Sequence, residues 1–218
     1  MTALLLAALW TCHTVPHFRI CTEGPLNDIT LDTRAPQSLA RNLRLLGARS
    51  YPHPIALYIV RSYSHLQELT GAYGKGTARP EEHAIYLVAG HLDELDHELN
   101  HEVATGLWGK SEFWIAEGLA AYAADPGRID ARCRKVLADR WSETLAGMVT
   151  PTWNAGDDPY PASVIYPMLG SFVKYLRTAY GLDRLRRVWK GGSASIPAVY
   201  GKPLDALDRE WRAALAGR

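Results

Sequence analysis

The amino-acid sequence predicts an α+β fold with a small sheet in the N-terminal half and a helical C-terminal half. Two observations support this prediction. The runs typical of β-strands all precede residue 90, and from residue 91 onward apolar residues recur at helical spacing. No internal repeat and no linker rich in Gly, Pro or Ser divides the 218 residues, so one domain with a sizeable core is expected.

The N-terminal half is predicted to combine strands with helices. Alternating or β-branched runs predict the strands, and helical spacing that stops at a glycine predicts the helices. Residues 71–77 are predicted to be a loop. Their Gly-Lys pair does not fit a phosphate-binding loop, because no Ser or Thr follows Lys75. The predicted strands are residues 15–21, 55–60 and 84–89, and the predicted helices are residues 37–46 and a helix from Ser62 or Ser64 to about Gly71.

The C-terminal half is predicted to be helical throughout. Apolar residues at helical spacing, with glycines and prolines between the segments, define the helices to within a few residues. The predicted helices are residues 91–105, 111–125, 128–148, 163–180, 182–192 and 203–216.

The composition argues against two classes of partner. Hydrophobic residues make up 47% and charged residues 22%, the balance of an ordinary globular domain. The formal net charge of +1 gives no electrostatic basis for binding nucleic acid or an anionic membrane. No apolar run reaches the roughly 20 residues that a membrane span needs.

Residues 1–12 are treated separately from the predicted domain, which is expected to span residues 13–218. The run from Ala3 to Trp10 is apolar, as in a signal peptide, but no Lys or Arg precedes it and no A-x-A site follows. It is either a degenerate export signal or the first element of the fold. The run favours an extracytoplasmic location, in a bacterial envelope or secreted, and leaves the compartment open.

The cysteines do not define a framework. Cys12, Cys21 and Cys133 are odd in number and lack C-x-x-C spacing. One disulfide could form among them, but buried free thiols are the favoured interpretation.

The stretch His97-Glu98-Leu99-Asn100-His101 lies in the first predicted C-terminal helix. Residues four apart share one helix face, so His97 and His101 can direct both imidazoles at one point, with Glu98 at the edge of that face. This H-E-x-x-H pattern supplies two nitrogen ligands for zinc and a carboxylate beside the metal. The alternative is a surface helix with two exposed histidines.

The next predicted helix holds Glu117 among apolar residues such as Ile115 and Leu119. A carboxylate there costs several kcal/mol unless it is paired or metal-bound. Gly118 costs the helix about 1 kcal/mol relative to Ala and would permit the close approach of another backbone. Both features fit a third metal ligand, with an arginine partner for Glu117 as the alternative.

Together, H-E-L-x-H and the following W-I-x-E-G-L-A-x-Y resemble the gluzincin zinc metallopeptidases, specifically the bacterial peptidase MA-like domains. Ile165-Tyr166 with the later S-F-V-x-Y-L, and the segment from Tyr200 to Leu204, are similar to that family too. The similarities cover most of residues 50–216. They imply a zincin-like fold, in which a small, mostly antiparallel sheet in the N-terminal half packs on the HExxH helix.

By this resemblance, one Zn²⁺ per chain is bound by His97, His101 and Glu117. Glu98 is then the general base, and Tyr166 is the candidate to stabilise the oxyanion, with a packing role as the alternative. Pro167 is expected at the first position of a helix, with Tyr166 just outside it. Fifteen residues lie between His101 and Glu117, so the turn at residues 106–110 must be tight.

The implied activity is zinc-dependent hydrolysis of peptide bonds in a peptide or protein substrate. Aminopeptidase relatives of this family use a G-x-M-E-N segment to bind the free amine of their substrate. The sequence has no such segment, which favours an endopeptidase. The alternative is a non-catalytic zincin-fold binding or scaffold protein that retains the metal site. The choice of metal, the substrate and the oligomeric state stay open.

Overall fold

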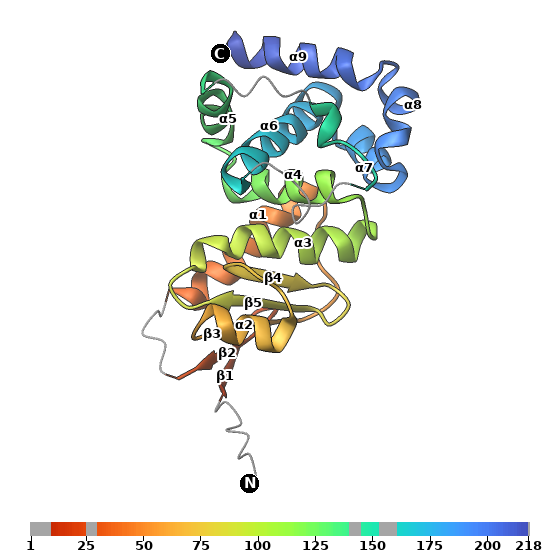
Figure 1. Cartoon of the computed structure of the whole chain (residues 1–218). Coiled ribbons are helices and arrows are strands. Elements are labelled where there is room, and N and C mark those ends of the chain that lie inside the picture. Colours follow the sequence, from red (N-terminus) through yellow and green to blue (C-terminus); the bar gives the residue numbers. More distant parts are fainter. Residues whose placement is uncertain (1–9, 25–29, 140–144, 153–160, 218) are drawn as a thin grey trace. The chain divides into compact units, whose positions relative to one another are not determined.

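A computed structural model describes residues 10–24, 30–139, 145–152 and 161–217 (Figure 1). Most of the expected export segment, residues 1–9, lies outside the described residues, and the expected boundary after residue 12 falls within the first strand. The chain divides into two compact units. The first comprises Met1–Arg44 and Ala48–Glu102, and the second comprises Leu45–Gly47 and Val103–Arg218.

The first unit contains a sheet of five strands among its described residues, in the order β1-β2-β3-β5-β4 (Figure 1). The central pairs β2–β3 and β3–β5 are parallel, whereas the edge pairs β1–β2 and β4–β5 are antiparallel. The α+β class is therefore confirmed, but the sheet is mixed rather than mostly antiparallel. Its strands are β1 (Trp10–Val15), β2 (Phe18–Glu23), β3 (Ile55–Val60), β4 (Gly76–Arg79) and β5 (Ala84–Val88).

One face of this sheet forms much of the core of the first unit. Ile20, Leu57 and Ile85 are neighbours in register and are each at most 1% exposed. The opposite face carries the half-buried rings of Tyr58 and Tyr86, which stack with their centroids 4.8 Å apart. The β-strand period of two thus separates the face of Ile20, Leu57 and Ile85 from the face of Tyr58 and Tyr86, where buried Val60 and Val88 form a second, smaller core with Leu66.

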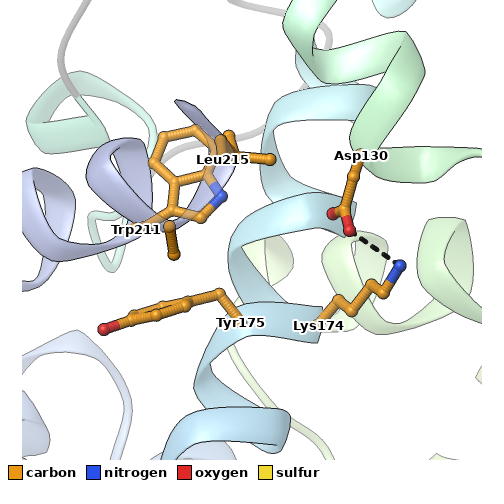
Figure 2. A pocket seen from close by; sticks show the side chains of 6 residues that line it. Asp130, Lys174, Tyr175, Trp211 and Leu215 are labelled. Carbon is orange, nitrogen blue, oxygen red and sulfur yellow. Dashed lines mark ion pairs between the residues drawn. The ribbon is translucent and has the colours of Figure 1, made fainter. Parts of the chain in front are cut away.

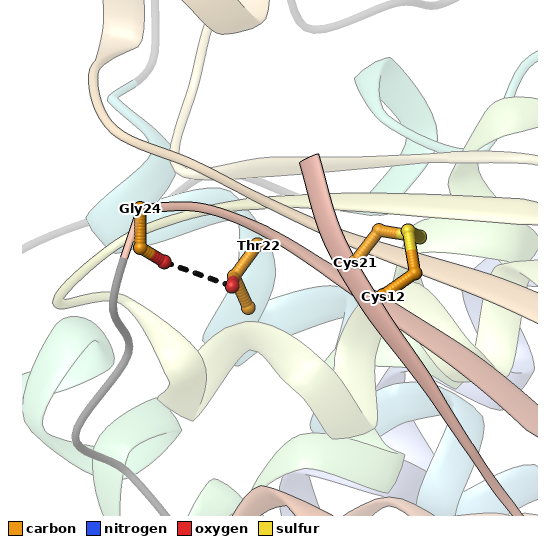
Figure 3. The surroundings of a disulfide bond; sticks show 4 residues. All are labelled: Cys12, Cys21, Thr22 and Gly24. Carbon is orange, nitrogen blue, oxygen red and sulfur yellow. Dashed lines mark hydrogen bonds between the residues drawn. A yellow bond between two sulfur atoms is a disulfide. The ribbon is translucent and has the colours of Figure 1, made fainter. Parts of the chain in front are cut away.

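The first predicted strand is wrong in one respect, because its alternating residues include a turn. Residues 16–17 separate β1 from β2, and His17 adopts a left-handed backbone with φ of 68°. This hairpin places Cys12 directly opposite Cys21, and the two form a disulfide (Figure 3). The expectation of free thiols is therefore wrong for this pair, since the hairpin was not foreseen. Cys133 is a buried free thiol, as expected.

Two helices connect the strands of the first unit, α1 (Leu31–Leu46) and α2 (Tyr63–Thr70). α1 begins earlier than predicted and includes Pro36. The carbonyl that Pro36 leaves without a helical donor belongs to exposed Asp32, where water can bind it. The predicted ends of α2 are confirmed. Ser62 accepts a hydrogen bond from the amide of His65 at 3.2 Å, and Gly71 ends the helix with φ of 73°.

A short 3₁₀ turn, η1 (Leu92–Glu94), leads into α3 (Leu95–Trp108). The boundary between the two units lies inside α3, after Glu102. The predicted tight turn is confirmed, because α3 ends at Trp108 and the next helix begins at Phe113. Gly109 makes this turn with φ of 86°, a conformation that favours glycine.

The described part of the second unit is helical. Its core includes the rings of Trp114, Phe172 and Trp211, each at most 1% exposed. The predicted helix 128–148 ends at Ala138, and residues 140–144 are not described. No described helix has the length and apolar character of a membrane span. The elements are α4 (Phe113–Ala124), α5 (Ile129–Ala138), η2 (Leu145–Gly147), α6 (Ala162–Tyr180), α7 (Leu182–Gly191), η3 (Ser193–Ser195), α8 (Ile196–Tyr200) and α9 (Leu204–Ala216).

Candidate metal centre

The imidazole rings of the two histidines of α3 point their Nε2 atoms toward each other. Their Nε2 atoms lie 3.1 Å apart, and His97 is only 9% exposed. Two imidazoles bound to one tetrahedral zinc at about 2.0–2.1 Å would have their nitrogens about 3.3 Å apart. The observed separation fits a shared metal ion. The alternative of two exposed histidines on a surface helix is wrong, because His97 is buried and His101 is half-buried.

Glu117 joins the histidine pair. His97, His101 and Glu117 each offer one ligand atom, and these atoms all lie within 4.8 Å of one another. Two imidazole nitrogens and one carboxylate oxygen are a donor set that zinc accepts in catalytic sites. The residues present therefore fit a zinc ion, as their types in the sequence predict.

Gly118, next to Glu117, allows α6 to pack closely against α4. A Cβ atom at Gly118 would lie 2.6 Å from Val173 Cγ2 and 2.9 Å from the carbonyl oxygen of Leu169. Real carbon atoms do not approach so closely, so only glycine fits without a shift of the α6 backbone. The predicted close approach of another backbone at Gly118 is confirmed.

Tyr166 lies inside α6 and is half-buried. The expectation that it precedes the helix is wrong, because α6 begins at Ala162 and contains Pro167. Pro167 leaves the carbonyl of Ser163 without a helical donor, and exposed Ser163 lies where water can take that place. Tyr166 shares a helix face with Gly170 and Val173, and Val173 packs against Gly118 of α4. That Tyr166 stabilises the oxyanion stays a prediction.

Glu98 is largely shielded from solvent, with 8% of its surface exposed. Edge strand β4 passes beside it, because a Cβ atom built at Gly76 would lie 3.1 Å from Glu98 Cγ. The carboxylate predicted to act as the general base thus lies beside the sheet of the first unit.

Sequence reasoning missed a hydrogen-bonded group directly after the second histidine. Glu102 is completely buried, and its Oε1 accepts hydrogen bonds from Tyr51 Oη at 2.7 Å and from His83 Nδ1 at 3.0 Å. Burial raises the pKa of Glu102, while the bonds from Tyr51 and His83 lower it. Burial and the bond to Glu102 also raise the pKa of Tyr51. The partners are distant in the sequence, so no spacing indicates this group.

A second set of polar contacts joins α3 to α1. Asn100 Nδ2 donates to Asn42 Oδ1 at 2.8 Å, and both side chains are buried. Asp96 accepts from Arg41 Nη2 at 2.8 Å and from the hydroxyl of Ser38. These bonds set the rotation of the first turns of α3 within the first unit.

The second unit contains two described cavities that do not include the metal group. The smaller, of about 10 Å³, is lined by Trp211, Tyr175 and the 2.8 Å ion pair of Lys174 with Asp130 (Figure 2). It holds at most one water molecule. The larger, of about 460 Å³, lies between α5 and the start of α6, and is lined by Arg132, Lys135 and Asp139 among others.

No family model and no curated protein matches the sequence. Among solved structures, the chain is similar to the crystal structure of an aminopeptidase N family protein from Idiomarina loihiensis, with a TM-score of 0.44 and 13% sequence identity. The match covers 90% of this chain and 42% of that protein, so this chain spans less than half of its length.

Proposed function

We propose that this protein is a zinc metallopeptidase of the gluzincin type, in which His97, His101 and Glu117 bind one Zn²⁺. The observation that carries the proposal is the convergence of two imidazole nitrogens and one carboxylate oxygen within 4.8 Å. Three protein ligands of these types would leave zinc with one position open for water or substrate, as in a catalytic rather than a structural site.

Zinc, when bound, supplies a Lewis acid for the substrate carbonyl and lowers the pKa of water. Glu98 follows a ligand directly in α3, so its carboxylate can take the proton of the attacking water and deliver it to the leaving amine. Its low exposure, 8%, keeps that carboxylate away from bulk solvent. We assign to Tyr166 a hydrogen bond to the developing oxyanion, a contribution of roughly 2.7–4 kcal/mol where similar donors have been removed.

The substrate is proposed to be a peptide or protein that is cleaved internally. This proposal rests on the missing G-x-M-E-N segment, since no such element is present to bind a free N-terminal amine. The polar residues that α3 keeps in the core, His97, Glu98, Asn100 and Glu102, support a catalytic role for this helix, because burying them costs stability.

The Cys12–Cys21 disulfide supports a location outside the cytoplasm, because disulfides persist in oxidising compartments. Thiol labelling of the denatured protein, taken from cells under acid quench, is expected to modify Cys133 alone. Three labelled cysteines would place the protein in a reducing compartment and contradict this location.

The test of the function combines metal analysis with peptide cleavage. Protein purified without a histidine tag should contain one zinc ion per chain and cleave members of a peptide library. Glu98→Gln should keep the zinc and lose hydrolysis by roughly 10²- to 10⁴-fold, because the general base is gone. Glu117→Ala should weaken zinc binding itself. Glu94→Gln is the matched control, since this half-buried acid pairs with Lys75 at 3.2 Å and should leave cleavage unchanged.

Cleavage by Glu98→Gln at the parent rate would show that the mechanism is wrong. Bound zinc without cleavage of any library peptide would instead favour the non-catalytic zincin-fold module. If the protein binds no zinc at micromolar concentration, both the metallopeptidase and the non-catalytic zinc-binding module are wrong.

A further inference from the structure

We propose that Gly76 is a positioning residue, which holds the Glu98 side chain in place by bringing the backbone of β4 against it. The inference rests on the proposed function, because it concerns the carboxylate assigned as general base. Gly76 is the first residue of β4, and it pairs with Leu87 across the sheet. β4 is an edge strand, with β5 as its one partner among the described strands.

The small residues of β4 occupy one side of the strand. Successive side chains of a strand point to opposite faces, so Gly76 and Ala78 share the face of Leu87 and Ile85, which are completely buried. Thr77 shares the other face with Tyr86. Of the residues of β4, the two with the smallest side chains thus share the face of buried Leu87 and Ile85, and Gly76 is the one shown beside Glu98.

Gly76 is required here for space and not for backbone conformation. Its φ lies outside the left-handed region, which other glycines of the chain adopt. A Cβ atom at this position would lie 2.7 Å from Leu87 Cδ2, 3.1 Å from Glu98 Cγ and 3.1 Å from the carbonyl oxygen of Tyr86. Carbon atoms pack best at about 3.5–4.0 Å, so an added methyl group must displace a neighbour.

The neighbours differ in how readily they can move. The carbonyl of Tyr86 belongs to the backbone of β5, and Leu87 is enclosed by the core with 0% exposure. Glu98 Cγ, at 3.1 Å from the added carbon, must give by a few tenths of an ångström, and its side chain keeps 8% exposure. A methyl group at residue 76 is therefore expected to push the Glu98 side chain away from its present position.

The chemical consequence follows from the role of Glu98. A displacement of about 1 Å in a catalytic group can reduce turnover by roughly 100-fold, and the smaller shift that a 3.1 Å contact requires should reduce it less. The zinc ligands are other side chains, so metal binding should not change. Gly76→Ala is therefore expected to lower kcat by roughly 3- to 10-fold, while zinc content and KM stay close to those of the parent.

The first experiment measures zinc content, kcat and KM for the parent and for Gly76→Ala. Gly127→Ala is the matched control, because a Cβ at exposed Gly127 meets no atom within 4 Å. A reduced kcat with unchanged zinc in Gly76→Ala alone supports the inference. A parent-like kcat in Gly76→Ala would overturn it, while cleavage by the parent would leave the proposed function intact.

The second experiment needs no activity, and therefore separates this inference from the proposed function. Thermal unfolding of the metal-free protein is compared for the parent, Gly76→Ala, Glu98→Ala and the double variant. If the added methyl group presses on Glu98 Cγ, Gly76→Ala lowers the midpoint more in the parent than in Glu98→Ala, where that atom is missing. Equal decreases in both backgrounds would mean that the methyl group meets only Leu87 and Tyr86, and would overturn the inference.

Discussion

The two helices that carry the candidate metal ligands are held in place by different physical means. In α3, directional hydrogen bonds connect buried polar side chains to distant parts of the first unit, as between Asn100 and Asn42 and between Glu102 and Tyr51. In α4, the buried side chains are mostly apolar, although Trp114 Nε1 donates to Glu112 at 2.8 Å, and Gly118 lets α6 pack directly against the helix backbone. The position of α3 therefore depends on a few directional hydrogen bonds, whereas the position of α4 depends on close packing at Gly118, which has no side chain.

The difference suits what each helix has to present. α3 is proposed to offer two ligands and a base, and His97 and Glu98 are separated by about 100° around its axis. A small rotation of α3 would misdirect all three groups at once, and directional bonds resist such a rotation. α4 is proposed to offer only Glu117, whose flexible side chain tolerates a rotation as long as the helix is packed at the right depth.

The largest effect is expected where close packing would be lost. Gly118→Ala should lower the free energy of unfolding by about 3 kcal/mol, the upper end for overpacking, because the new methyl group meets the Leu169 backbone as well as Val173. Urea denaturation of the metal-free protein measures this. Gly127→Ala, with open space around it, should change stability by less than about 0.5 kcal/mol. If both variants were equally stable, α4 would not be positioned by close packing.

A smaller loss is expected when a directional bond of α3 is removed. Glu102→Leu leaves Tyr51 and His83 without their carboxylate, although these two can still bond each other at 3.3 Å. We expect a loss of about 1–2 kcal/mol in the free energy of unfolding, because the buried Tyr51 hydroxyl is left with a poor partner.

Tyr51→Phe in the same chain tests the reason for that loss. When both polar partners are replaced, no donor of Tyr51 remains buried without an acceptor, so the double variant should recover much of the stability. A double variant that is less stable than Glu102→Leu would show that Glu102 acts by packing and not by its hydrogen bonds.

The same contrast explains which features the sequence could predict. The HELNH pattern and the apolar surroundings of Glu117 are local, so spacing predicted that the two histidines converge, and the cost of a carboxylate among apolar residues indicated Glu117 as a candidate third ligand. The strands at residues 55–60 and 84–89 were equally local and are confirmed within a residue. α8 was missed because five residues are too few to show a helical period.

Features that depend on distant residues could not be found in this way. Glu102 meets Tyr51 and His83 in the folded chain across sequence separations of 51 and 19 residues. The Cys12–Cys21 disulfide depended on a turn at residues 16–17 that alternation had concealed. The role of Gly76 depends on how closely β4 passes Glu98, a distance that no sequence pattern contains.

A still smaller effect is expected at the exposed end of the α1–α3 contacts. Arg41 pairs with Asp96 at 2.8 Å, but the Arg41 side chain is 44% exposed. Arg41→Ala should reduce the free energy of unfolding by about 0.5–1 kcal/mol, because exposed ion pairs contribute little and the hydroxyl of Ser38 still binds Asp96. Urea denaturation at low and high salt should show the difference shrinking as salt rises. A difference that persists in 1 M salt would indicate a buried bond rather than a screened pair.

The smallest effect is expected for directional bonds on the surface of the second unit, where Glu210 of α9 is the counterpart of buried Glu102. Bonds from Lys202 and Tyr180 lower the pKa of Glu210 from its usual 4.5 to about 2. A lowered pKa means that ionised Glu210 stabilises the fold above about pH 4.5, and that this contribution is lost as the pH falls toward 2. Glu210→Gln should therefore lower the thermal midpoint slightly at pH 7, and the difference from the parent should decrease steadily below pH 4.5. A difference that is constant from pH 7 to pH 3 would show that Glu210 acts by packing alone, unlike the hydrogen bonds that orient α3.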